Sequence, residues 1–156
     1  MISGNQIHQT QSAALAVNVG LGGLATGGGT TNVTVTNNTV SNVIASRGIT
    51  VQDNQDPALG PFPTVCANIS GNSFSNIAGQ AGNGEFMRVR RLNGTVRVTQ
   101  ATPTAAANAA ELDDANGFND PTKINVSGAV QFSQAACPVR ERGPPALRPA
   151  AAREDD

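Results

Sequence analysis

The chain has 156 residues, a net charge of −1 and 13% charged residues, so its charge does not favour binding to nucleic acid or to an anionic membrane. It has no Trp or Tyr and only five Phe, which argues against a site that holds sugars or bases by aromatic stacking. No segment is apolar over the ~18 residues that a membrane span needs, and the length favours a single domain.

A nine-residue motif recurs along the chain. Residues 35–43 match residues 69–77 at an offset of 34, and residues 2–7 hold a partial copy that begins 33 residues before the first. Apolar residues take the first, sixth and ninth positions, and Ser, Thr, Asn and Gly lie between them. Self-similarity at such a period is typical of stacked structural units. The repeat therefore predicts an all-β fold, a right-handed parallel β-helix (solenoid) fragment.

The asparagines of the motif are candidate structural residues. Asn tolerates positive φ and hydrogen-bonds its own backbone, so it is suited to a corner between strands. In a stack, equivalent asparagines lie above one another, and we expect them to hydrogen-bond between layers. This predicted ladder comprises Asn5, Asn38 and Asn72 at one corner and Asn42 and Asn76 at another.

The segment before the first full motif predicts a strand followed by a turn. Residues 15–19 alternate as a short strand, and six of the residues 20–29 are Gly. A glycine run cradles phosphate where it leads into a helix, whereas residues 32–35 predict a strand. A flexible turn is therefore the preferred interpretation.

After the first motif, residues 48–51 predict a strand and residues 52–63 an exposed loop with three Pro. Asp53 and Asp56 in this loop are conceivable Ca²⁺ ligands. The chain lacks the further oxygen donors and the terminal Glu of an EF-hand loop, so we interpret both as turn residues. We expect no metal site and no cofactor.

The dipeptide Asn93-Gly94 predicts a C-terminal β-hairpin near residues 86–99. Asn-Gly suits a two-residue type I′ turn, and the segments on both sides of it alternate apolar and polar residues. Pairing across that turn places Val89 opposite Val98. The apolar side chains of the hairpin then share one face.

The opposite face of this hairpin carries three arginines. Arg88, Arg90 and Arg97 form a candidate binding site for an anionic polymer such as a surface polysaccharide, because guanidinium groups bind carboxylates and sulfates. The alternative is that these charges protect an exposed edge from aggregation.

One short Ala-rich helix is predicted near residues 103–115. Thr102-Pro103 suits its first turn and Asn116-Gly117 its end. Three acidic residues near its C-terminus suggest paired catalytic carboxylates, but adjacent side chains on a helix point about 100° apart and no base or metal ligand is close in sequence. We interpret them as a solvated helix end and assign no catalytic residue. These acidic residues are Glu111, Asp113 and Asp114.

Residues 123–126 and 129–132 predict the last strands. Cys66 and Cys137 are the only cysteines, and they lack the spacing and the companions of a zinc site. In an oxidising compartment they would form one disulfide, whereas in the cytosol they would be two buried thiols.

The repeated Ile-Ser-Gly-Asn-x-Phe motif, the Met-Arg-Val-Arg segment, the Ala-rich helix and the closing Ala-Ala-Cys-Pro resemble the C-terminal end of large bacterial secreted β-strand-repeat proteins. Those are similar to right-handed parallel β-helix, adhesin-like surface proteins. The resemblance covers residues 2–138 and implies a non-enzymatic structural module, secreted or at the bacterial cell surface, joined to upstream β-helical repeats of a longer chain. Residues 138–156 depart from it and predict a disordered tail, so the repeat domain is expected to span residues 1–137.

Two other functions stay open at this point. Carbohydrate-active β-helix enzymes, either polysaccharide lyases or glycoside hydrolases, place carboxylates on an exposed sheet, often with Arg or Lys and sometimes with Ca²⁺. In this chain the strand motifs carry Asn, Ser and Thr instead. The third function is a module that binds anionic polysaccharide through the arginine face.

Overall fold

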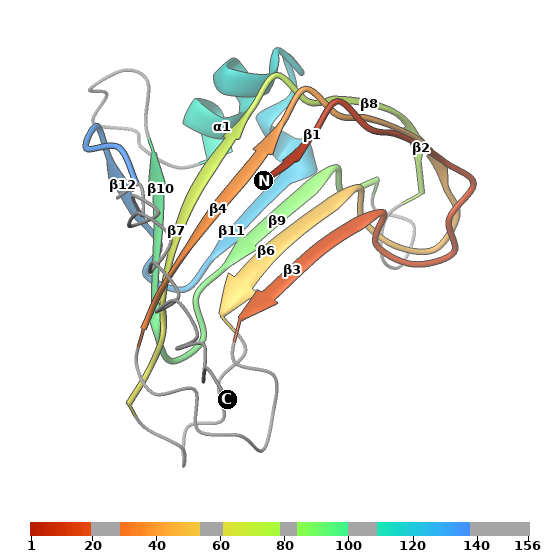
Figure 1. The fold of residues 1–156 in the computed structure, drawn as a ribbon. Coiled ribbons are helices and arrows are strands. Elements are labelled where there is room, and N and C mark those ends of the chain that lie inside the picture. The colour runs from red at the N-terminus through yellow and green to blue at the C-terminus, as the bar shows by residue number, and fades with distance from the viewer. Residues whose placement is uncertain (20–28, 54–60, 79–83, 100–108, 138–156) are drawn as a thin grey trace, which may run out of the picture.

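The computed structural model is a parallel β-helix in which three complete turns of chain each give one strand to each of three sheets (Figure 1). The structure describes residues 1–19, 29–53, 61–78, 84–99 and 109–137. The predicted glycine-rich turn, most of the proline-containing loop, the first part of the predicted helix and the predicted tail lie outside these residues.

The strands follow one another through the three sheets in a fixed order. Sheet A contains β1 (Ile2–Ser3), β4 (Thr30–Thr36), β7 (Thr64–Ser70), β10 (Thr95–Thr99) and β12 (Gln131–Ser133). Sheet B contains β2 (Gln6–His8), β5 (Thr39–Val43) and β8 (Ser73–Ile77). Sheet C contains β3 (Leu15–Val19), β6 (Ile49–Asp53), β9 (Met87–Arg90) and β11 (Ile124–Ser127). All pairs among these strands are parallel, which confirms the predicted solenoid.

The strand register reproduces the sequence repeat. Ile2 pairs with Val35, and Val35 pairs with Ile69, so the offsets of 33 and 34 residues each correspond to one turn of the solenoid. In the next sheet Val40 pairs with Phe74 at the same offset. The first and sixth positions of the motif therefore stack layer upon layer.

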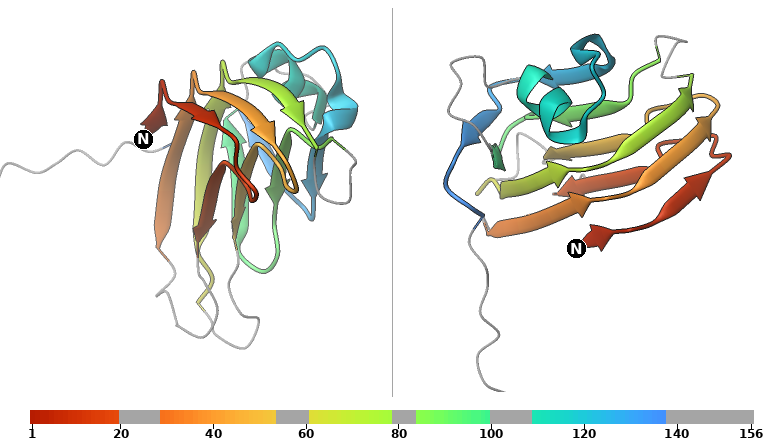
Figure 2. Two further views of the ribbon diagram at one scale, coloured as in Figure 1. Left: turned by 90° about the vertical axis from the view of Figure 1, so that its right-hand side faces the viewer. Right: turned by 90° about the horizontal axis from the view of Figure 1, so that it is seen from above.

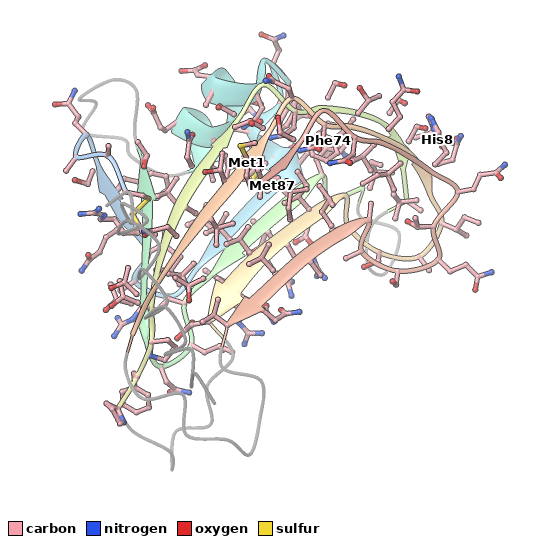
Figure 3. The ribbon with its side chains drawn as sticks, viewed as in Figure 1. Met1, His8, Phe74 and Met87 are labelled. Atoms are coloured by element: carbon pink, nitrogen blue, oxygen red, sulfur yellow. A yellow bond between two sulfur atoms is a disulfide. The ribbon has the colours of Figure 1, made fainter. Side chains whose placement is uncertain are left out.

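Alternate side chains of sheets A and C meet in the main core. Val65 and Val96 of sheet A and Ile49 and Val89 of sheet C are fully buried in one cluster. Met87 lies in the same interior, whereas His8 lies on the outer side of sheet B (Figure 3). β-branched residues dominate these positions because they pack well on a pleated surface.

The predicted hairpin at residues 86–99 is wrong. β9 pairs with β6 and β11 in sheet C, whereas β10 pairs with β7 and β12 in sheet A. Neither Asn93 nor Gly94 has the positive φ that a type I′ turn requires at both positions. The dipeptide instead forms a corner between two sheets.

Asp53 explains why the chain turns a corner there. It is the last residue of β6 and is fully buried, in contrast to the exposed turn residue expected from the sequence. Its carboxylate accepts the backbone N–H groups of Leu92, Asn93 (2.8 Å) and Gly94. A side chain at position 94 would also meet the Pro63 carbonyl, so only Gly fits this corner.

We expect Asp53→Asn to destabilise the protein by about 2 kcal/mol, because an amide offers one acceptor oxygen and turns an NH₂ group toward buried N–H donors. Urea unfolding followed by far-UV circular dichroism measures the loss. Asp114→Asn is the matched control, since Asp114 is exposed on the helix. Equal unfolding midpoints for the two variants would contradict this role of Asp53.

The helix α1 (Ala109–Asn116) replaces the fourth strand of sheet B. It lies between β10 and β11 in the chain and covers the end of the stack opposite β1 (Figure 2). Leu112 is 1% exposed and belongs to the main core. The predicted helix end is confirmed, since Gly117 has φ +69°. No helix within the described ranges is long and apolar enough to cross a membrane.

The acidic residues of α1 differ from the expected solvated helix end. Glu111 and Asp113 are buried, and Asp113 Oδ1 accepts the backbone N–H of Asp120 at 3.0 Å. Asp114 alone is exposed, as expected. Helix propensity did not reveal the burial of Asp113, because its partner Asp120 belongs to the loop before the short 3₁₀ helix η2 (Pro121–Lys123), which packs against α1.

Candidate interaction surfaces

A continuous asparagine ladder runs through the stack at the corner between sheets A and B. Asn5 donates from its backbone N and its Nδ2 to Asn38 Oδ1, at 3.1 and 2.9 Å. Asn38 donates in the same way to Asn72 Oδ1, at 3.1 and 2.9 Å. Asn38 and Asn72 are each 1% exposed. The predicted stacking of Asn5, Asn38 and Asn72 is thereby confirmed.

The ladder has a fourth member that the sequence repeat did not reveal. Asn72 donates from its backbone N (3.0 Å) and Nδ2 (2.8 Å) to Asn116 Oδ1, at the end of α1. Gly71 N also donates to Ala115 O, as Asn37 N donates to Ser70 O one turn earlier. The end of the helix thus imitates the corner of a fourth coil. A spacing of 44 residues, not 34, hid this equivalence.

The second predicted pair of asparagines lies on the surface. Asn76 Nδ2 donates to Asn42 Oδ1 at 2.6 Å, and both residues adopt positive φ (52° and 56°) within β8 and β5. At the first corner the positive φ belongs instead to Asn37, the residue before the buried ladder member. The expected stacking of Asn42 and Asn76 is therefore confirmed, although both lie within β5 and β8, and at the buried ladder the positive φ lies one residue before the ladder asparagine.

The N-terminal end of the stack leaves its core half covered. Leu15 and Val17 are only partly buried, whereas their register partners Ile49 and Val51 are fully buried. β1, β2 and β3 each have a single hydrogen-bonded neighbour among the described strands, as do β12, β8 and β11 at the opposite edges of the same sheets. Parallel pairing uses both edges of an interior strand, so this end presents a row of unpaired backbone groups.

The three candidate anion-binding arginines do not form one face. Arg88 and Arg90 alternate with buried residues of β9 and lie on the outer side of sheet C. Arg97 lies on the outer side of sheet A, across the core from them. The predicted shared face depended on the hairpin and is wrong together with it. Binding of an anion by these residues stays a prediction.

Arg97 is engaged with the disulfide bond between Cys66 and Cys137, which is formed. Its Nη2 and Nε donate to Cys66 Sγ at 3.1 and 3.3 Å, and Nη2 donates to Ala136 O at 3.2 Å. A shallow hollow of ≈ 230 Å³ lies beside it. Threonines dominate the lining of this hollow: Thr30, Thr64, Cys66, Thr95, Arg97 and Gln131.

A buried charged cluster lies at the start of β9. Glu85 Oε2 pairs with Arg47 Nε, and Glu85 Oε1 accepts Asn125 Nδ2 at 2.7 Å and lies 3.8 Å from Arg88 Nη2. Burial lowers the pKa of Arg88, Arg47 and Arg90 lower it further, and Glu85 opposes this change. A hollow of ≈ 400 Å³ adjoins the cluster and is lined in part by Glu85, Asn125 and Thr122.

Comparison with known proteins identifies no relative whose function could be transferred to this chain. A scan against protein-family models and searches of curated proteins and of solved structures found no match to this chain. Within the described residues, no three His, Cys, Asp or Glu side chains lie together as a metal site would need. The function is therefore inferred from the fold and from the chemistry of these surfaces.

Proposed function

We propose that this chain is a non-enzymatic structural module of an extracellular, adhesin-like surface protein. It forms the terminal coils of a β-solenoid whose N-terminal end joins upstream coils of the same kind. The observation that carries this proposal is the difference between the two ends of the stack. The α1 helix covers the core at one end with the fully buried Leu112, whereas Leu15 and Val17 at the other end are only partly buried among the described residues.

The direction of the asparagine ladder specifies what fits the open end. Each ladder oxygen accepts two N–H groups from the coil before it. Asn5 Oδ1 has no such donor among the described residues. A preceding coil with an asparagine at the same corner supplies both donors and at the same time buries Leu15 and Val17.

Two further features support an extracellular and non-enzymatic role. The Cys66–Cys137 bond is of a kind that persists in oxidising compartments. The buried carboxylates of Asp53, Glu85 and Asp113 are occupied by backbone N–H groups or by neighbouring side chains. Glycoside hydrolysis requires two carboxylates that flank a sugar, whereas each of these three is engaged in a structural contact.

The proposal is tested by adding one coil. A copy of residues 35–68, inserted between Met1 and Ile2, extends the repeat by 34 residues in register. We expect the melting temperature to rise by about 5 °C or more, because each coil gains stability from its neighbour. Differential scanning calorimetry measures the change.

The matched control is Asn5→Ala in both the parent and the extended chain. Asn5 is exposed in the parent, and its oxygen gains two donors in the extended chain, so the substitution should cost about 1 kcal/mol more there. The proposal would be overturned if the melting temperature stayed unchanged and proteases removed the added copy. Equal costs of Asn5→Ala in both chains would also overturn it.

A further inference from the structure

The outer face of sheet C carries an ordered array of polar groups around two arginines. Arg88 lies between Thr50 and Asn125, its register partners in β6 and β11. Arg90 lies in the next row, between Gln52 and Ser127. Alternate residues of a strand are about 6.6 Å apart and adjacent strands about 4.8 Å apart. Each guanidinium is therefore flanked by side chains that hydrogen-bond to hydroxyl and carboxylate groups.

Positive charge is in excess on this face. Among the described residues, Glu85 is the only carboxylate that forms an ion pair with Arg88, and Arg47 already pairs with it. Arg88 approaches the other oxygen of Glu85 to only 3.8 Å and makes no hydrogen bond to the described residues. Arg90 makes neither a hydrogen bond nor an ion pair with them. Arg47 and Arg88 thus both contact Glu85, and the positive charges of Arg47 and Arg90 lower the pKa of Arg88.

Unpaired polar atoms occur on the same face. Among the described residues, the buried side-chain atoms without a hydrogen-bond partner are Arg88 Nε and Asn18 Oδ1. Asn18 is the register partner of Gln52 and continues the Arg90 row toward the edge of the sheet. An unmade hydrogen bond of this kind costs about 1–3 kcal/mol. A water molecule, an ion or a bound ligand can complete such a group.

We propose that the outer face of sheet C binds an acidic polysaccharide, with Arg88 and Arg90 as its charged contacts. Guanidinium groups take carboxylate or sulfate in forked pairs, and the partly exposed Gln52, Asn125 and Ser127 beside them hydrogen-bond to the sugar hydroxyls. No aromatic side chain lies in these rows, so the site takes charged sugars and not neutral ones held by stacking. Arg97 has no part in it. The site does not depend on the open end of the stack.

The test is a calorimetric titration of the full chain with two probes, oligogalacturonate for carboxylate and a heparin oligosaccharide for sulfate. It is run at about 20 mM and again at about 150 mM salt. We expect binding of at least one probe that weakens with salt. In the double variant Arg88→Gln/Arg90→Gln the affinity should fall at least about tenfold at low salt.

Arg97→Gln is the matched control, because it removes the same charge from the opposite sheet and should leave the affinity unchanged. Circular dichroism and thermal unfolding establish whether each variant is folded. If the double variant does not fold, the single variant Arg90→Gln replaces it in the titration. Absence of binding to both probes at low salt would overturn the proposal. So would equal losses in the Arg97 and the double variant, or tighter arginine-dependent binding of single-stranded DNA than of either saccharide.

Discussion

Replacing Asn72 with alanine is expected to destabilise the protein by about 4 kcal/mol. The side chain is 1% exposed and belongs to the centre of the asparagine ladder. Its oxygen accepts two N–H groups of Asn38, and its Nδ2 donates to Val35 O and Asn116 Oδ1, at 3.0 and 2.8 Å. Alanine removes all of these hydrogen bonds together and leaves buried N–H and C=O groups of the neighbouring residues without partners. This costs more than the loss of one exposed hydrogen bond. Equilibrium unfolding in urea measures the effect.

Asn42→Gly is the control for this substitution. It removes a ladder hydrogen bond of similar length, with Asn76, but on the surface and at a positive φ that glycine adopts freely. We expect a change within about 0.5 kcal/mol. If Asn72→Ala costs no more than Asn42→Gly, the buried ladder does not hold the coils together.

Removing the disulfide is expected to cost about 4 kcal/mol, a large part of the stability of a domain of this size. Cys66 in β7 and Cys137 after β12 are 71 residues apart in sequence, so the bond closes a long loop and restricts the unfolded chain strongly. It also holds the end of sheet A, where β12 pairs only with β10 among the described strands. The measurement is the urea midpoint of Cys66→Ser/Cys137→Ser against the parent chain.

Reduction of the parent chain by dithiothreitol tests the contribution of the disulfide to stability independently of the substitutions. It should lower the midpoint of the parent to near that of the double variant and leave the double variant unchanged. Either single variant should behave like the double variant, because the bond needs both sulfurs. A parent chain whose midpoint does not move on reduction would show that the bond contributes nothing to stability.

The repeat predicted the architecture because it reflects contacts between equivalent residues. A stack imposes the same burial on Val35 and Ile69 and the same corner on Asn38 and Asn72, so the sequence carries one signal in each turn. That periodicity sufficed to predict the parallel solenoid and the stacked ladder, whereas the strand at residues 15–19 was predicted from its local alternation.

Features that depend on partners remote in sequence were not predictable in this way. Asn93-Gly94 is locally a good hairpin turn, but the buried carboxylate of Asp53 and the paired sheets on either side impose a corner there. Asn116 was recognisable as a helix end and not as the fourth member of the ladder. The alternation within β9 correctly predicted outward arginines, whereas the separation of Arg97 onto sheet A follows only from strand pairing.

Amide hydrogen exchange at β3 tests most directly whether the N-terminal end accepts another coil. In the parent chain, β3 amides that point away from β6 should exchange rapidly, while those of β6 are protected on both sides. In the chain with the inserted copy of residues 35–68, we expect β3 protection to rise by about a hundredfold or more. Amides of β3 that are already slow in the parent chain, or that gain no protection in the extended one, would contradict the proposed role of this end.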